Sequence, residues 1–319
     1  MITKNPLNIA VVGTGAMGSI YAGLLAKAGH KVWAIDIWAE HIKTICDYGL
    51  KIEGASGNET VKDLVATEKL RAADQCDLYI IATKAKDVSE AAELIKKHMR
   101  PNSIVLSIQN GLGSGERVAH FIPSKNIILG VADGFGASLK APGVVHHHAM
   151  KLIRLGEMDG GASKRLQNLQ EVWRSAGFNV KLFTNIEQLI WEKFICNVTF
   201  SAPCTVFDCS INLLMANRES WDIALACALE AYQIARVKNV PLSFEDPRPY
   251  VTEFGEQLGD SSPSMRLDHI AKRHSEIDSI NGMVATLGEE LRVSTPYNRV
   301  LSAVVRSREA AFSEPPFCH

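Results

Sequence analysis

Short runs of consecutive apolar residues alternate with helical patterns through the first half of the chain. The runs predict strands at residues 8–13, 31–36, 50–53, 59–65, 77–83, 103–108 and 127–132. Apolar residues at helical spacing predict intervening helices at residues 16–28, 39–48, 87–98 and 115–121. Continuous apolar runs are typical of strands that are buried on both faces. The pattern therefore predicts a mostly parallel sheet whose faces are covered by helices.

The pattern changes near residue 185. Before this point, the turn at residues 141–143 leads into a pair of strands at 144–149 and 152–156, a helix at 163–176 and a strand at 179–184. After it, one helix follows another, with breaks expected at Pro203, 241–249, 259–263 and Pro296. We expect the α/β class, with a doubly wound sheet in a domain at residues 1–185 and an all-helical domain at residues 186–319.

Composition and charge narrow the class of protein. The formal net charge is -1, so no global field attracts nucleic acid or an anionic membrane. The seven cysteines form no C-x-x-C pair, which favours a reducing compartment over a disulfide framework. No apolar stretch reaches the roughly 20 residues that span a bilayer. We therefore expect a cytoplasmic protein without a nucleic-acid or membrane partner.

A glycine-rich loop follows the first predicted strand and opens the first predicted helix. It has the form G-x-G-x-x-G, and in this context it is the fingerprint of a Rossmann domain that binds a dinucleotide. The helix N-terminus offers N–H groups and a positive dipole end to phosphates. The alternative is a glycine-rich turn with no ligand. The residues expected at the cofactor are Gly13, Thr14, Gly15, Ala16, Met17 and Gly18.

Asp36 ends the second predicted strand, where an acid commonly binds the adenosine ribose. A carboxylate there accepts from the ribose hydroxyls and repels a 2′-phosphate, which favours NAD over NADP. Ile37 and Trp38 supply no arginine, although Lys43 lies further along. The alternative role for Asp36 is to cap the next helix. The cofactor is therefore NAD or NADP, with NAD favoured.

A polar stripe runs along the first helix of the second half. Lys193, Asn197 and Ser201 are four residues apart, which places a cation, an amide and a hydroxyl on one face. Their neighbours are apolar, so this face needs partners or a ligand. The alternative is a lysine that reaches solvent and an asparagine that is satisfied in the core.

Further candidates follow predicted strands or lie near the C-terminus. Asn110 and Lys84 follow strands whose carboxyl ends are the ligand-binding edge of an open α/β sheet. Alternatively, Asn110 could simply be a turn residue, and Lys84 could be a solvated charge. Ser264 could simply be an N-cap, and Glu276 could be an exposed helix charge. Alternation along a strand would split the histidines 146–148 between two faces, so no metal site is expected.

Together these motifs resemble the ketopantoate reductase family over nearly the whole chain. The matching pieces are the glycine loop, T-K-A-K-D at 83–87, Q-N-G at 109–111, W-x-K-x-x-x-N at 191–197, S-M-x-x-D at 264–268 and E-I-D-x-I-N-G at 276–282. The resemblance implies a Rossmann domain, a helical domain, an active site in the cleft between them, and a homodimer. It also implies hydride transfer between a nicotinamide and C2 of a 2-keto acid, which for ketopantoate would be a step of pantothenate biosynthesis.

The resemblance also implies residue roles. Lys193 would be the general acid, and Glu276 would bind the substrate or orient Lys193. Asn110 would hold the nicotinamide end and the substrate, and Lys84 would line the cofactor side. The residues implied at the polar ends of the substrate are Asn197, Ser201 and Ser264.

Two departures from the family pattern leave alternatives open. Ser201 stands where the family often has a second asparagine, and Ile37 stands where it usually has an arginine. These differences suit an NAD-dependent dehydrogenase of another branched or aromatic 2-hydroxy acid. A third possibility is a protein that senses NAD(P) without turnover, although the polar set Lys193, Asn110 and Glu276 argues against it.

Overall fold

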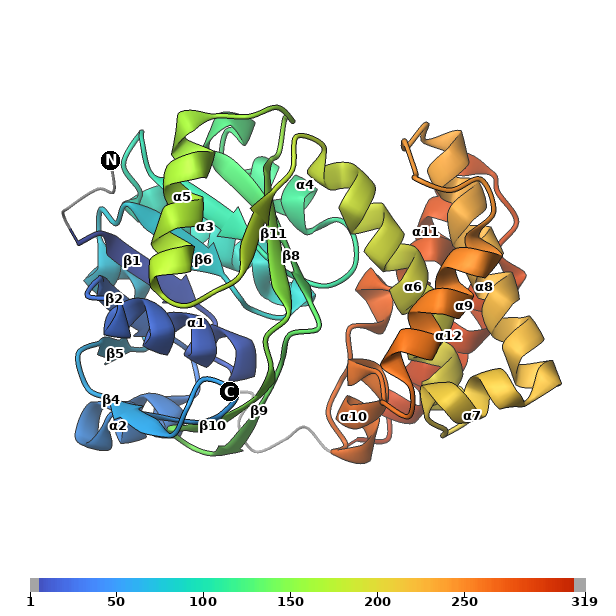
Figure 1. The fold of residues 1–319 in the computed structure, drawn as a ribbon, viewed down its shortest axis with the longest axis horizontal. Coiled ribbons are helices and arrows are strands. Elements are labelled where there is room, and N and C mark those ends of the chain that lie inside the picture. Colours follow the sequence, from blue (N-terminus) through green and yellow to red (C-terminus); the bar gives the residue numbers. More distant parts are fainter. Residues whose placement is uncertain (1–5, 313–319) are drawn as a thin grey trace. The chain divides into compact units, whose positions relative to one another are not determined.

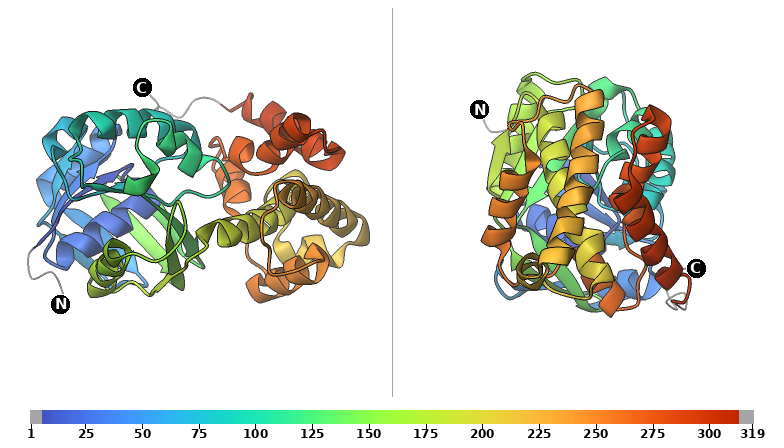
Figure 2. Two further views of the ribbon diagram at one scale, coloured as in Figure 1. Left: turned by 90° about the horizontal axis from the view of Figure 1, so that it is seen from above. Right: turned by 90° about the vertical axis from the view of Figure 1, so that its right-hand side faces the viewer.

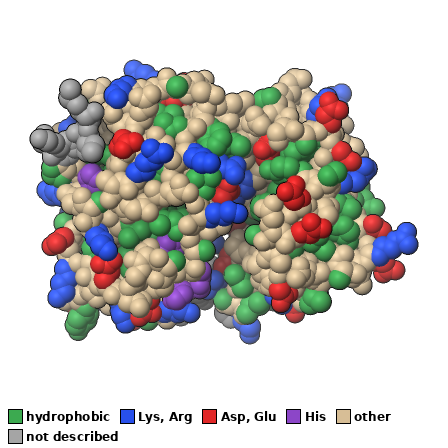
Figure 3. Space-filling model, in the orientation of Figure 1, with side chains coloured by type: hydrophobic (Ala, Val, Ile, Leu, Met, Phe, Trp, Pro, Cys, Tyr) green, Lys and Arg blue, Asp and Glu red, His purple; other side chains and the backbone are tan. Residues whose placement is uncertain are grey.

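The computed structural model describes residues 6–312, which form two compact units. Within the described residues, unit 1 comprises 6–109 and 113–186, and unit 2 comprises 110–112 and 187–312. The short loop at 110–112 thus belongs to unit 2, although it leaves a strand of unit 1. Across the described residues, no helix combines the length and apolar character needed to cross a membrane. Basic and acidic side chains occur on the visible faces of both units (Figure 3), as the small net charge predicts.

Unit 1 is built on an eight-stranded sheet with the order β12-β11-β8-β7-β6-β1-β2-β5 (Figure 1). Its neighbouring strands are parallel except β8 and β11, which are antiparallel. The strands are β1 (Asn8–Val12), β2 (Lys31–Ile35), β5 (Val65–Thr67), β6 (Leu78–Ile81), β7 (Ile104–Ser107), β8 (Ile127–Asp133), β11 (Leu152–Glu157) and β12 (Val180–Leu182). The helices of this unit are α1 (Ala16–Lys27), α2 (Ala39–Tyr48), α3 (Val88–His98), α4 (Ser114–Ala119) and α5 (Lys164–Ser175), with 3-10 turns η1 (Leu70–Ala73), η2 (Ala85–Asp87) and η3 (Ser124–Asn126).

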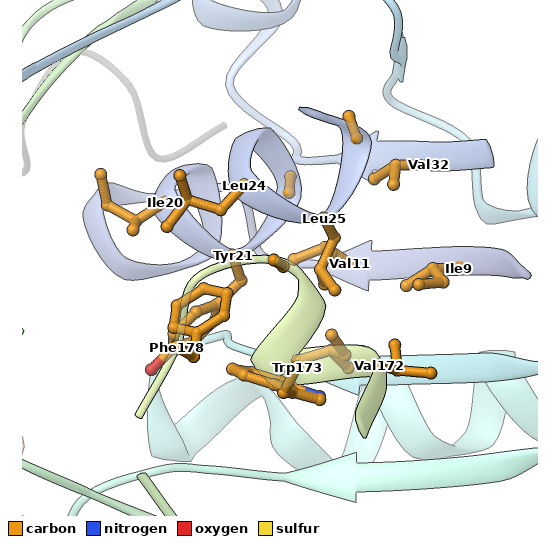
Figure 4. Packing of buried hydrophobic residues seen from close by; sticks show 14 of the residues in the cluster. Ile9, Val11, Ile20, Tyr21, Leu24, Leu25, Val32, Val172, Trp173 and Phe178 are labelled. Carbon is orange, nitrogen blue, oxygen red and sulfur yellow. The ribbon is translucent and has the colours of Figure 1, made fainter. Parts of the chain in front are cut away.

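Both faces of this sheet are covered, as the continuous apolar runs predict. Ile9 and Val11 of β1 belong to one buried cluster, which includes Tyr21 of α1 and Trp173 of α5 (Figure 4). Ala10 and Val12 point to the opposite face and belong to a second cluster with residues of α3 and α4. Figure 2 shows helices on both sides of the strands. The predicted α/β fold with a doubly wound parallel sheet is confirmed.

A second, four-stranded sheet was not expected from the sequence. Its order is β4-β3-β10-β9, from β4 (Glu59–Val61), β3 (Leu50–Gly54), β10 (Val144–Ala149) and β9 (Gly136–Ala141). The predicted single strand at 59–65 is therefore wrong: exposed Lys62 and Asp63 interrupt it, and β4 and β5 lie in different sheets.

The strands predicted at 144–149 and 152–156 both form, but they do not pair with each other. Strand β10 pairs with β9 and, in parallel, with β3, whereas β11 joins the large sheet. The three histidines of β10 alternate as predicted. His147 is buried, and the rings of His146 and His148 lie 4.7 Å apart on the other face.

Unit 2 is helical. Its elements are α6 (Ile186–Val206), α7 (Ile211–Ala216), α8 (Arg218–Val237), α9 (Pro247–Leu258), α10 (Ser264–Ile270), η4 (Ile277–Ser279), α11 (Asn281–Leu291) and α12 (Pro296–Glu309). Helix ends at 241–249, 259–263 and Pro296 are confirmed. The predicted break at Pro203 is wrong, because α6 continues through it to Val206. Pro203 cannot donate an N–H to the carbonyl four residues earlier, but only three residues of α6 follow it, so the helix ends shortly afterwards. The side chain of Thr205 donates to the carbonyl of Ser201 at 2.7 Å.

Candidate functional site

The three glycines of the loop after β1 have different surroundings. Gly13 has φ +90°, and a Cβ there would lie 2.5 Å from the backbone nitrogen of Thr83. A Cβ on Gly18 would lie 2.0 Å from the carbonyl oxygen of Gly13. Both positions therefore require glycine for the packing of strand and helix. A Cβ on Gly15 would meet nothing within 4 Å, so this part of the backbone is open to a ligand.

The open backbone lies at the N-terminus of α1. Gly15 is the N-cap of this 12-residue helix and provides no side-chain cap. The first-turn N–H groups and the helix dipole favour an anion at this point. Gly13 and Thr14 both donate their N–H groups to the carbonyl of Ile35, at 2.8 and 3.1 Å, which fixes the loop to the end of β2. The residues present fit the pyrophosphate of a dinucleotide.

His41 of α2 supports the loop from behind and was missed by the sequence reasoning. Its Nδ1 accepts the N–H of Gly143 at 2.9 Å, so the ring proton is on Nε2. Nε2 lies 3.4 Å from the hydroxyl of Ser19, which donates to the carbonyl of Thr14 at 2.8 Å. The imidazole is 1% exposed and stacks on Trp38 with ring centroids 5.1 Å apart. A neutral imidazole thus connects the glycine loop to the turn between β9 and β10.

The two other residues predicted on the cofactor side differ in exposure. Asp36 is half-buried at the end of β2, and its Oδ1 accepts the N–H of Trp38 at 3.0 Å. It does not cap α2, whose N-cap is Trp38 without a side-chain bond. Lys84 is exposed at the start of η2, one residue after Thr83, whose backbone approaches Gly13. The structure therefore places both at the same edge of the sheet as the glycine loop.

In unit 2, the polar stripe on α6 is embedded among apolar side chains. Lys193 and Asn197 are half-buried, and Ser201 is only 4% exposed. Trp191, Phe194, Ile195, Cys196 and Val198 on the same helix belong to the buried core of this unit. The stripe therefore presents polar groups next to apolar side chains of the buried core, as the sequence predicts.

The loop at 110–112 packs against the segment that carries Glu276. The N–H of Leu112 donates to the carbonyl of Ser279 at 3.0 Å. Gly111 has φ +82°, and a Cβ there would lie 2.1 Å from the same carbonyl oxygen. Asn110 is thereby brought to the segment at 276–281, in which Glu276 is half-buried.

The same segment is attached to α6 through Asn281, which the sequence analysis did not single out beyond its place in the motif. Its side-chain amide donates to the carbonyl of Val198 at 2.8 Å and accepts from the N–H of Ala202 at 3.3 Å. Its only signal in the sequence is its place in the motif E-I-D-x-I-N-G. An asparagine before a glycine usually suggests a turn, whereas this asparagine begins helix α11.

Ser264 is the predicted residue that these contacts do not connect to the others. It is the exposed first residue of α10, whose N-cap is Pro263. Pro263 and not Ser264 occupies the N-cap position, so the N-cap alternative is not supported.

We predict that His41 makes the fold sensitive to acid. Burial lowers the pKa of His41 below its usual 6.5, although the nearby Asp36 opposes this shift. The unfolded chain therefore binds a proton before the folded one, and stability is lost as the pH falls below about 6.5. Each unit of lowering corresponds to about 1.4 kcal/mol. His41→Gln, whose amide can accept from Gly143 and donate to Ser19, should show a smaller loss of melting temperature between pH 7.5 and 5.5 than the wild type. An equal loss in both proteins would contradict this role.

Comparison with known proteins agrees with the two-part organisation. The family model "Ketopantoate reductase PanE/ApbA" matches residues 9–160, and "Ketopantoate reductase PanE/ApbA C terminal" matches residues 185–309. The 2-dehydropantoate 2-reductase of Streptococcus pyogenes serotype M1 is 30% identical over 306 residues, covering 96% of this chain and 99% of that protein.

Solved structures give the same result. A PanE/ApbA family ketopantoate reductase from Ralstonia eutropha JMP134 is 28% identical with a TM-score of 0.86, and the match covers 95% of this chain and 98% of that one. D-mandelate dehydrogenase, solved with NADH and anilino(oxo)acetate, is also 28% identical, with a TM-score of 0.87 and coverage of 96% and 99%. Since the family models match most of the sequence and a relative aligns over nearly its full length, the chain belongs to the ketopantoate reductase family of NAD(P)-dependent oxidoreductases.

Proposed function

We propose that the protein reduces the C2 carbonyl of a 2-keto acid, with ketopantoate as the leading substrate. The observation that carries the proposal is the arrangement of unit 2. One short segment, residues 276–281, contacts both the loop of Asn110 and the helix of Lys193. An amide, an ammonium and a carboxylate are thereby placed on elements that pack together, which is the chemistry that a keto acid requires.

Lys193 is proposed as the general acid. A reduced nicotinamide cofactor, held by the glycine loop, Asp36 and Lys84, would supply the hydride for C2 of the substrate. As the carbonyl double bond becomes single, negative charge develops on the oxygen, and a nearby ammonium stabilises that charge. The ammonium then gives its proton to the oxygen and completes the hydroxyl. The apolar neighbours of Lys193 on α6 strengthen this interaction by reducing the access of water.

The remaining residues are proposed to bind and orient. Asn110 holds the substrate and the nicotinamide end, and Glu276 binds the substrate or orients Lys193. Asn197, Ser201 and Ser264 bind the polar ends of the substrate. Because Ser264 lies on α10 with an exposed side chain, its part in binding requires the substrate to reach that helix.

NAD is the proposed cofactor, held by the glycine loop, Asp36 and Lys84. One oxygen of Asp36 accepts the N–H of Trp38, which orients the carboxylate. Its negative charge favours ribose hydroxyls and disfavours a 2′-phosphate. Ile37 is 74% exposed and offers no charge to such a phosphate.

A second candidate is an NAD-dependent dehydrogenase of another branched or aromatic 2-hydroxy acid. Two observations favour it. Asp36 follows β2 and has no arginine after it, and Ser201, at 4% exposure, offers only a short, nearly buried hydroxyl. The similarity to D-mandelate dehydrogenase supports the same candidate.

We also propose that the protein is a homodimer. A measurement of its mass in solution tests this proposal.

A panel of 2-keto acids with NADH or NADPH separates these functions. We expect reduction of at least one 2-keto acid, measured as the loss of reduced-cofactor absorbance. Fast turnover of ketopantoate supports the first candidate, and turnover of another keto acid alone supports the second. Tight cofactor binding without any turnover would instead indicate a sensing protein.

Replacement of Lys193 tests the general acid. Lys193→Met should lower kcat by about 100-fold or more, since general acid catalysis contributes roughly 10²–10⁴-fold. The dissociation constant of the cofactor should not change, because the glycine loop belongs to unit 1 whereas Lys193 belongs to unit 2. Lys238→Met, at an exposed position of unit 2, is the matched control and should retain full activity. Retained turnover in Lys193→Met would exclude the assignment.

Replacement of Asp36 tests the cofactor preference. Asp36→Asn keeps the shape and the acceptor for Trp38 but removes the charge. We expect the ratio of kcat/KM for NADH over NADPH to fall by about 10-fold, in line with about 1.4 kcal/mol for the lost repulsion. Asp47→Asn, an exposed acid on α2, serves as the control for net charge. An unchanged ratio would show that Asp36 does not select the cofactor.

A further inference from the structure

Asn281 is completely buried at the start of α11 and hydrogen-bonds to the backbone of another helix, α6. Its amide lies between the carbonyl of Val198 and the N–H of Ala202. These two groups, four residues apart, are the pair that a regular α-helix bonds directly. Side chains that enter this ladder fix local bends of a helix. Asn281 therefore contacts α6 within the turn that precedes Pro203.

The orientation of this amide is determined by a chain of buried partners. Nδ2 of Asn281 also donates to Oδ1 of Asn298 at 2.8 Å. Nδ2 of Asn298 donates to Oε2 of Glu230 at 2.7 Å and to the carbonyl of Cys227 at 3.1 Å. Both oxygens of Glu230 accept hydrogen bonds from N–H groups, so Glu230 fixes which end of each amide faces which partner.

Glu230 is itself held in place by backbone groups. It is 7% exposed on α8, and its two oxygens accept the N–H groups of Tyr297 and Asn298 at 2.9 and 3.0 Å. These N–H groups belong to the first turn of α12, where a negative charge is favoured by the helix dipole. The chain from Glu230 to Asn281 therefore connects α8, α12, α11 and α6.

These hydrogen bonds matter because Asn281 lies on the same segment as Ser279, which contacts the loop of Asn110. Two residues earlier, the carbonyl of Ser279 receives the N–H of Leu112 and packs against Gly111. On α6, the two groups that Asn281 contacts are adjacent in sequence to Asn197 and Ser201. One short segment thus sets the loop of Asn110 and the polar stripe of α6 relative to Glu276.

We propose that Asn281 is a positioning residue for the reaction: it fixes the register of α6 against the segment that carries Glu276, and so places Lys193. This inference rests on the proposed function for the role of Lys193. A slide of α6 by a fraction of a turn would carry its ammonium away from the other polar groups. Misplacement by about 1 Å can lower a rate by about 100-fold.

A buried asparagine of unit 1 provides a matched control. Asn126 is 5% exposed, and its Nδ2 donates to the carbonyls of Pro101 and Ser103 at 2.9 and 2.8 Å. Asn126→Ala removes a buried amide of similar bonding far from α6 in the sequence. Both alanine variants should lower the melting temperature, and only Asn281→Ala should affect the reaction selectively. Asn281→Ser, whose hydroxyl cannot bridge both groups, is the milder variant if the alanine variant does not fold.

The experiment compares wild type, Asn281→Ala, Asn281→Ser and Asn126→Ala with the 2-keto acid that the wild type reduces fastest. For Asn281→Ala we expect kcat to fall about 10- to 100-fold. Its KM for the keto acid should change less than its kcat, and the dissociation constant of the cofactor should stay within about twofold of the wild type. Hydrogen–deuterium exchange of the peptides containing Ala202 and Leu112 should become faster, which it should not in Asn126→Ala.

The outcomes separate the two proposals. A wild type that reduces no 2-keto acid overturns the proposed function. With an active wild type, a kcat in both Asn281 variants that falls no further than in Asn126→Ala overturns the positioning role alone. Unchanged exchange at Ala202 in the Asn281 variants also overturns it, because α6 would then not depend on this amide. A selective loss of kcat together with faster exchange at both peptides supports the inference.

Discussion

The packing of Gly111 against the carbonyl of Ser279 is the contact on which the arrangement of unit 2 depends. A left-handed backbone at Gly111 and the absence of a Cβ let two loops, more than 160 residues apart in the chain, approach until their peptides bond directly. Any side chain at this position would force the loops apart. As a result, Asn110 leaves the sheet of unit 1 and joins the unit that carries Lys193 and Glu276.

In unit 1, the glycine loop likewise depends on backbone contacts that only glycine allows. Gly13 and Gly18 have backbone atoms where a Cβ would have to be, and Gly15 faces open space. Contacts between backbones place the loop, and the remaining gap is left for a ligand. Buried side chains then keep each arrangement in one state: His41 behind the glycine loop, and Asn281 behind α6. Burial of such polar groups is costly unless they are bonded, so a bonded set favours one geometry over its alternatives.

Local patterns predicted much of the architecture. The strand, glycine loop and helix at residues 8–28 follow from short-range periodicity and from the conformational freedom of glycine, and the structure confirms them. The same holds for the helical second half. Predictions that required knowledge of partners were less successful. The strands at 144–149 and 152–156 have a local signal, yet one pairs with β3, about 90 residues earlier, and the other with β8.

The sequence alone was sufficient for the α/β class, the dinucleotide loop and the polar stripe of Lys193, Asn197 and Ser201, because each is encoded by the spacing of neighbouring residues. Folding in three dimensions was needed for the continuation of α6 through Pro203, the neutral tautomer of His41 and the bridge made by Asn281. Each of these depends on a hydrogen-bonding partner or on packing from a segment distant in the chain. Residue spacing cannot encode such a partner, because the distance between two segments is set only when the whole core packs.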